Sequence, residues 1–93
     1  MSLPMSDKDF AAIVKRVSAA TAGPWKSYIE GRDHESGSHF IMTAKDDIEP
    51  TGATHADQDF MAEARQDIPR LLAEIRRLKM LAREPVPDSL AEF

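Results

Sequence analysis

The histidines are the residues of this chain with the most versatile chemistry, because an imidazole can bind a metal ion or transfer a proton near neutral pH. There are three, His34, His39 and His55, and their spacing matches neither HExxH nor the paired short spacings of a zinc site. We therefore expect exposed loop histidines. One alternative stays open, in which His34 and His39 face each other across a hairpin and share a metal ion with Asp33 or Glu35.

No other pattern in the sequence predicts catalysis. The run DDIE, residues 46–49, lacks the alternating oxygen ligands and the central glycine of an EF-hand. No serine lies in a glycine-flanked nucleophile elbow, and the four glycines form no phosphate-cradling run. Cysteine is absent, which excludes disulfides, thiolate metal sites and a cysteine nucleophile. The sequence predicts neither an enzyme nor a bound cofactor or metal.

A basic run near the end of the chain is the next candidate for chemistry. Arg76, Arg77, Lys79 and Arg83 fall at the end of a predicted helix, where they offer contacts to nucleic-acid phosphates. The simpler explanation is that cations in a last turn complement the helix dipole. A pI of about 5.3 also argues against a nucleic-acid partner, since domains that bind nucleic acid are usually basic overall. A nucleic-acid-associated regulator is kept as one alternative function, and metal or ligand binding at the hairpin is the other.

Composition places these residues in a folded protein. The chain has 93 residues, of which 42% are hydrophobic and 30% charged, with a net charge of −4. This length predicts a single domain, residues 1–93, with residues 1–5 as a disordered leader. No apolar run approaches the roughly 20 residues that cross a bilayer, and no signal peptide is apparent. We expect a cytoplasmic protein with no membrane partner.

A helix and a sharp corner open the predicted fold. Ser6 and Asp9 have the spacing of a capping box, and apolar residues then recur with helical spacing at Phe10, Ile13, Val14 and Val17. Gly23 is expected to end this helix in the left-handed conformation, and Pro24 cannot continue it. Trp25, the only tryptophan, then begins a strand. We interpret Gly23, Pro24 and Trp25 as a structural corner, with ligand stacking on Trp25 as the alternative.

Two short strands follow the corner. Segment 25–31 has an alternating pattern, and segment 39–44 is rich in β-branched and aromatic residues. The polar loop GRDHESGS joins the two segments as a hairpin. Residues 45–54 are expected to be loop because of Pro50, Gly52 and their acidic cluster.

The remainder is a long helical pattern that Thr54 or Asp57 caps. Pro69 interrupts the pattern and Asp67 is a good cap, so we expect the helix to be kinked or broken into segments 55–66 and 68–82. Residues 84–93 contain two prolines and form a tail that docks Leu90 and Phe93 on a neighbour. The predicted class is α+β, in the order helix, hairpin, long helix and tail.

The long helix also predicts self-association. Apolar residues recur with heptad spacing at 61, 64, 68, 71, 75, 78 and 82. A continuous helix over residues 54–82 would be about 40 Å long, whereas a compact domain of this size has a radius of gyration of about 12 Å. Its apolar side chains would therefore exceed what one chain can cover. We expect a homodimer whose interface contains Ile68, Leu71, Leu72, Ile75, Leu78 and Leu81.

Two segments carry a resemblance to known proteins. AATAGPW (19–25) and ADQDFMAEARQDIPRLLAEIRRL (56–78) resemble small uncharacterised proteins of phages, prophages and bacterial genomes. In these proteins an AAATPGPW-like corner precedes an AD.EFIA.AR.DIP.LL.E..RL-like helix, and Ea22-like phage proteins carry comparable pieces. The resemblance implies a prophage-type accessory protein that acts through protein-protein contact with itself or an unknown partner, and it transfers no catalytic residue. Ala22 departs from it, standing where the similar proteins often have proline.

Overall fold

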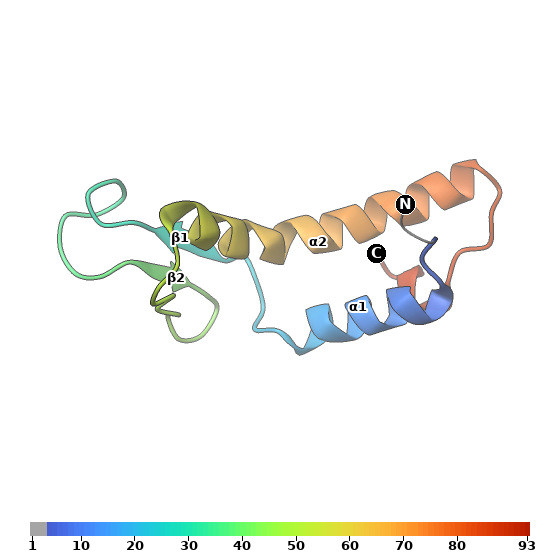
Figure 1. Cartoon of the computed structure of the whole chain (residues 1–93). Helices are drawn as coiled ribbons and strands as arrows, with labels where there is room; N and C mark the ends of the chain where they lie inside the picture. The colour runs from blue at the N-terminus through green and yellow to red at the C-terminus, as the bar shows by residue number, and fades with distance from the viewer. Residues whose placement is uncertain (1–3) are drawn as a thin grey trace. The chain divides into compact units, whose positions relative to one another are not determined.

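The computed structural model describes residues 4–93, so most of the predicted leader lies outside the described residues. The elements are α1 (Asp7–Ala19), β1 (Lys26–Tyr28), β2 (Phe40–Met42), α2 (His55–Leu81) and a 3-10 turn, η1 (Asp88–Leu90) (Figure 1). The α+β class and the predicted order of helix, hairpin and long helix are confirmed.

The contacts within the chain divide it into two compact units. We call Thr21–Asp67 the hairpin unit, and residues 4–20 together with Ile68–Phe93 the helical unit. The single domain expected from the length stays a prediction.

Helix α2 begins at the predicted cap and continues through its proline. The Thr54 hydroxyl accepts the Asp57 N–H at 3.0 Å, and the Asp57 carboxylate accepts the Thr54 N–H at 3.1 Å. Two of the orphan amides at the helix start are thereby satisfied. One helix then extends from His55 to Leu81 with Pro69 inside it, so the alternative of two separate helices is wrong. A proline removes its own N–H bond and crowds the carbonyl four residues earlier, yet the residues on both sides of Pro69 keep a helical backbone.

The end of α2 is formed without glycine. Arg83 has a φ of 56°, in the left-handed region where glycine is usual. The Glu84 N–H donates to the Lys79 carbonyl at 2.9 Å, and the Arg83 N–H donates to the Met80 carbonyl at 3.1 Å. This pair of bonds is a Schellman motif, which satisfies two of the last carbonyls of the helix.

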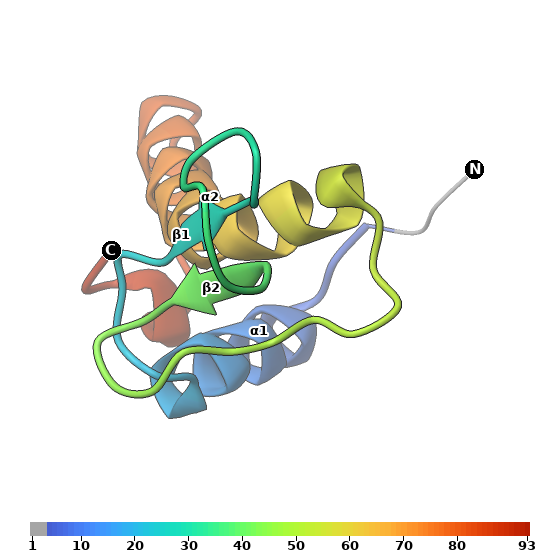
Figure 2. The same ribbon diagram turned by 90° about the vertical axis from the view of Figure 1, so that its left-hand side faces the viewer.

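The hairpin unit contains a small antiparallel sheet, which lies beside the first turns of α2 (Figure 2). Its strands are shorter than predicted, and Ser27 pairs with Ile41 at the centre of the register. Ile41 also exchanges two backbone hydrogen bonds with Ile48, at 2.8 and 2.9 Å, so the predicted loop 45–54 contributes a one-residue bridge to the sheet. The face that carries Ile29 and Ile41 is buried, whereas Tyr28 and Phe40 stack on each other on the opposite face, where Met42 is exposed.

The helical unit has its own core, formed by Phe10 of α1, Leu72 of α2 and Leu90 of η1. Partly buried side chains surround these three, namely Ile13, Val14, Val17, Ile75, Val86 and Phe93. The expectation that Leu90 and Phe93 dock on a neighbouring chain is therefore wrong. The prolines of the tail stop α2 but allow η1 to return, so that Leu90 fills the core of its own chain.

The corner between α1 and β1 differs from the prediction in one respect. The capping box of Ser6 and Asp9 is present, but α1 ends at Ala19, because Ala20 is already extended at φ −71° and ψ 151°. Gly23 has no left-handed backbone and does not terminate the helix. A Cβ at Gly23 would lie 3.3 Å from Gln66 Oε1, so glycine is favoured there by close packing against α2.

Candidate functional site

A row of exposed leucines on α2 is the most conspicuous surface feature of the helical unit. Leu71, Leu78 and Leu81 are 60%, 50% and 69% exposed. At about 100° per residue they fall on one side of the helix, together with Glu74, and Leu72 falls on the other side. We call Leu71, Glu74, Leu78 and Leu81 the leucine seam. Three large apolar side chains in one row favour a surface that binds protein.

The six predicted interface residues do not share one environment. Leu72 is 3% exposed and Ile75 packs against the same core cluster, so these two side chains stabilise the unit that carries them. Ile68 is 39% exposed and lies beside the leucine seam. Heptad spacing identified an apolar helix but could not separate the side that η1 and α1 cover from the side that stays open.

Glu74 and Arg77 form an ion pair along the edge of the leucine seam. The hydrogen bonds from Arg77 lower the pKa of the Glu74 carboxyl below its ordinary value, and the pKa of Arg77 is raised by the same pairing. Glu74 is therefore charged at neutral pH. A charge in the seam restricts how a second helix can lie against it.

The basic residues proposed for nucleic-acid contact mostly have partners within the chain. Arg76 is half-buried and donates from Nη1 to the Phe93 carbonyl at 3.4 Å, while Arg77 pairs with Glu74. Lys79 Nζ lies 3.7 Å from a Glu84 carboxylate oxygen and 5.8 Å from the centroid of the Phe10 ring. Arg83 forms the helix end. These contacts explain the cations by local structure, and the nucleic-acid hypothesis stays a prediction.

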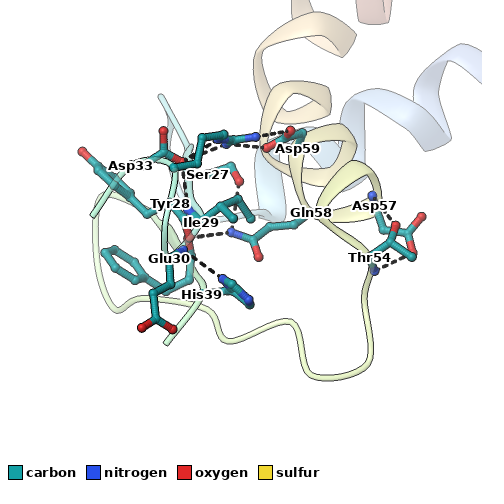
Figure 3. Close-up of polar contacts among 12 residues, drawn as sticks. Ser27, Tyr28, Ile29, Glu30, Asp33, His39, Thr54, Asp57, Gln58 and Asp59 are labelled. Carbon is teal, nitrogen blue, oxygen red and sulfur yellow. Dashed lines mark hydrogen bonds and ion pairs between the residues drawn. The ribbon is translucent and has the colours of Figure 1, made fainter. Parts of the chain in front are cut away.

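The hairpin unit contains a polar network centred on Gln58, which is only 2% exposed (Figure 3). Its amide nitrogen lies 3.0 Å from Ser27 Oγ, 3.0 Å from the Tyr28 carbonyl and 2.9 Å from the Phe40 carbonyl. One side chain of α2 therefore contacts both strands. Because buried polar atoms must be paired, this amide fixes the sheet to the helix.

A second glutamine holds the corner. The Trp25 N–H donates to Gln66 Oε1 at 2.7 Å, and Gln66 Nε2 donates to the Trp25 carbonyl at 3.1 Å, as a neighbouring strand would. The Trp25 indole donates to the Thr21 carbonyl at 3.1 Å, and Arg65 Nε donates to the same oxygen at 2.9 Å. These contacts give Trp25 a structural role, and its stacking on a ligand stays an untested alternative.

Arg32 joins the hairpin loop to α2. It pairs with both carboxylate oxygens of Asp59 at 2.8 and 3.0 Å, and its Nε donates to Asp33 at 3.0 Å (Figure 3). The hydrogen bonds from Arg32 lower the pKa of Asp59 to about 2, with help from Ser27. The pKa of Asp33 is lowered by the same guanidinium.

These shifts predict that the hairpin unit loses stability in acid. The pKa of Asp59 is about 2 in the folded chain, below its ordinary value of 3.8. The stabilisation is therefore fully present above about pH 5 and is lost progressively as the pH falls towards 2. Urea unfolding at neutral pH and near pH 2.5 measures the loss. Asp59→Asn should make this acid-induced loss of stability smaller. Asp47→Asn is the control for the change in net charge. Equal acid sensitivity of wild type and Asp59→Asn would contradict the role of this pair.

His34 and His39 contact other groups of the chain and are not arranged to share a metal ion. His34 Nδ1 is 2.6 Å from the Ser36 carbonyl, and its ring tilts against Phe40. His39 Nδ1 accepts the Glu30 N–H at 3.0 Å, and its ring meets that of His55 edge-on at 4.9 Å. Within residues 4–93, no three side chains of the usual ligating types are grouped to hold a metal.

A shallow pocket of about 180 Å³ opens beside His39, where Ser38 donates to Glu49 at 3.1 Å. The segment 50–53 completes its wall. The pocket is open to solvent and has a mixed polar and apolar lining, so its shape selects no ligand class.

Gln58, Gln66, Arg32 and Asp59 were not singled out in the sequence. The available signal was indirect: the two glutamines are eight residues apart, which places them about 80° apart around one predicted helix. Glutamine is common on exposed helix surfaces, so spacing alone does not predict burial.

Comparisons with protein-family models, curated proteins and solved structures found no match to this chain. The resemblance to phage and prophage proteins therefore stays a prediction. Among the helices of residues 4–93, none has the length and apolar character needed to span a bilayer.

Proposed function

We propose that this chain is a small, non-enzymatic accessory protein of prophage type that acts in the cytoplasm through protein-protein contact, and that it self-associates through the leucine seam. The observation that carries the proposal is the exposure of Leu71, Leu78 and Leu81 on the side of α2 away from the core. Full burial of a leucine contributes about 1.5 to 3 kcal/mol. A second copy that covers these side chains gains this contribution on both chains.

The local packing supports the same proposal. Leu72, next to Leu71 in the chain, is covered by α1 and η1, so the unit already has a core without the seam. The seam leucines are therefore not needed to complete that core. Helix faces of this kind are typical of helix-helix association.

Sedimentation tests the proposal with two variants. The wild-type mass should rise from 10.4 kDa towards twice that value between about 1 µM and 1 mM, a range that corresponds to association free energies of about −8 to −4 kcal/mol. Leu71→Asp combined with Leu78→Asp should remain monomeric over this range, because it places two carboxylates in the seam.

Met80→Asp is the matched control. Met80 is 54% exposed on the same helix but lies away from the seam, so this variant should associate like the wild type. Circular dichroism checks that each variant keeps its helices. A wild type that remains monomeric at the highest concentration would overturn the proposal.

A further inference from the structure

The leucine seam contains one charged position, and that position decides the direction in which a second helix can pair. Leu71, Glu74, Leu78 and Leu81 are separated by three, four and three residues, which makes them positions a, d, a and d of a heptad. Glu74 is thus a seam residue, although its carboxylate also pairs with Arg77 at the edge.

A parallel pair in register would place Glu74 against the partner's Glu74. Two carboxylates would then face each other between the leucines, where water is partly excluded and like charges repel strongly. In an antiparallel pair each a position faces a d position of the other helix. If the pair is centred on residue 76, Leu71 faces the partner's Leu81 and Glu74 faces the partner's Leu78.

The antiparallel arrangement also gives Glu74 a favourable electrostatic environment. Arg77 occupies position g, at the flank of the seam, so the partner's Arg77 lies near the same centre. Each Glu74 keeps its own Arg77 and gains a second cation across the interface. The two outer contacts, Leu71 with the partner's Leu81 and its symmetric equivalent, are wholly apolar.

We propose that two copies of this chain pair antiparallel through the leucine seam, with Leu71 of each copy against the partner's Leu81 and with Glu74 and Arg77 around the twofold axis. This inference rests on the self-association proposed above and adds its direction and register. The occupant of the seam is thus a second copy, whose seam has complementary charge and spacing, rather than an unrelated helix.

The absence of cysteine from the sequence allows a direct test by disulfide cross-linking. Three single variants are prepared, Leu71→Cys, Leu81→Cys and, as a control off the seam, Met80→Cys. Each is oxidised alone and in pairwise mixtures, at a concentration where sedimentation finds the wild type dimeric. Disulfides form only where Cα atoms approach to about 4.4 to 6.8 Å, so the products report which positions face each other.

The expected result is that mixing Leu71→Cys with Leu81→Cys yields about tenfold more cross-linked dimer than either variant alone. Mixtures that contain Met80→Cys should yield as little as the single variants. Strong cross-linking of Leu71→Cys or Leu81→Cys with itself would show a parallel pair and overturn the inference. A dimer by sedimentation without any cross-link would overturn the seam as its interface, whereas a monomeric wild type would overturn the proposed function itself.

Discussion

Replacing Leu90 by alanine should lower the free energy of unfolding by about 2 to 5 kcal/mol, the range for removing a buried leucine from a packed core. Leu90 is 0% exposed and packs with Phe10 and Leu72, so its removal leaves a cavity that the neighbouring side chains fill only in part. Domains of this kind are stable by only about 5 to 15 kcal/mol, and a chain this short lies near the lower end. The variant should therefore be partly unfolded at 37 °C.

Urea unfolding followed by circular dichroism measures this loss at a concentration low enough to keep the chain monomeric. Met80→Ala is the matched control, because it also shortens a large apolar side chain but at an exposed position of the same unit. It should change the free energy of unfolding by less than about 0.5 kcal/mol. If Leu90→Ala had an equally small effect, η1 would not belong to the core, and the tail would have to be assigned another role.

The fold class could be predicted because its signals are local. Ser6 with Asp9 and Thr54 with Asp57 are separated by three residues, and both pairs form the reciprocal hydrogen bonds that this spacing predicts. The strand order likewise follows from short apolar segments around a polar loop. Each of these features depends on residues close together in the chain, which is the scale at which pattern and backbone geometry agree.

The candidate site depends on contacts between distant residues, and there the sequence was less informative. Leu71 and Leu72 are identical in type and adjacent, yet Leu90 and Phe10 cover only one of them. The prolines of the tail indicate where α2 stops but not where the chain goes next. Gln58 was overlooked for a related reason: its carbonyl acceptors lie 18 and 30 residues away.

Replacing Gln58 by glutamate should be the most damaging single change in the hairpin unit. The two side chains have nearly the same shape, but the substitution removes the amide donor that serves Ser27, Tyr28 and Phe40. A carboxylate would then face two carbonyl oxygens in a site that is 2% exposed. Leaving buried acceptors unpaired costs about 1 to 3 kcal/mol, and an uncompensated buried charge costs more.

Amide hydrogen exchange in β1 and β2 is the appropriate measurement, because it reports on this sheet separately from the helical unit. Gln58→Met provides the matched comparison, since it removes the donor without adding charge and should cause a smaller loss of protection. Lowering the pH from 7 to about 5, where Asp59 is still charged, should partly rescue Gln58→Glu. Burial raises the pKa of the new carboxyl, and the protonated carboxyl regains one donor, whereas Gln58→Met has no group to protonate. If both variants lost protection equally and neither responded to pH, the amide of Gln58 would not be the contact that joins the sheet to α2.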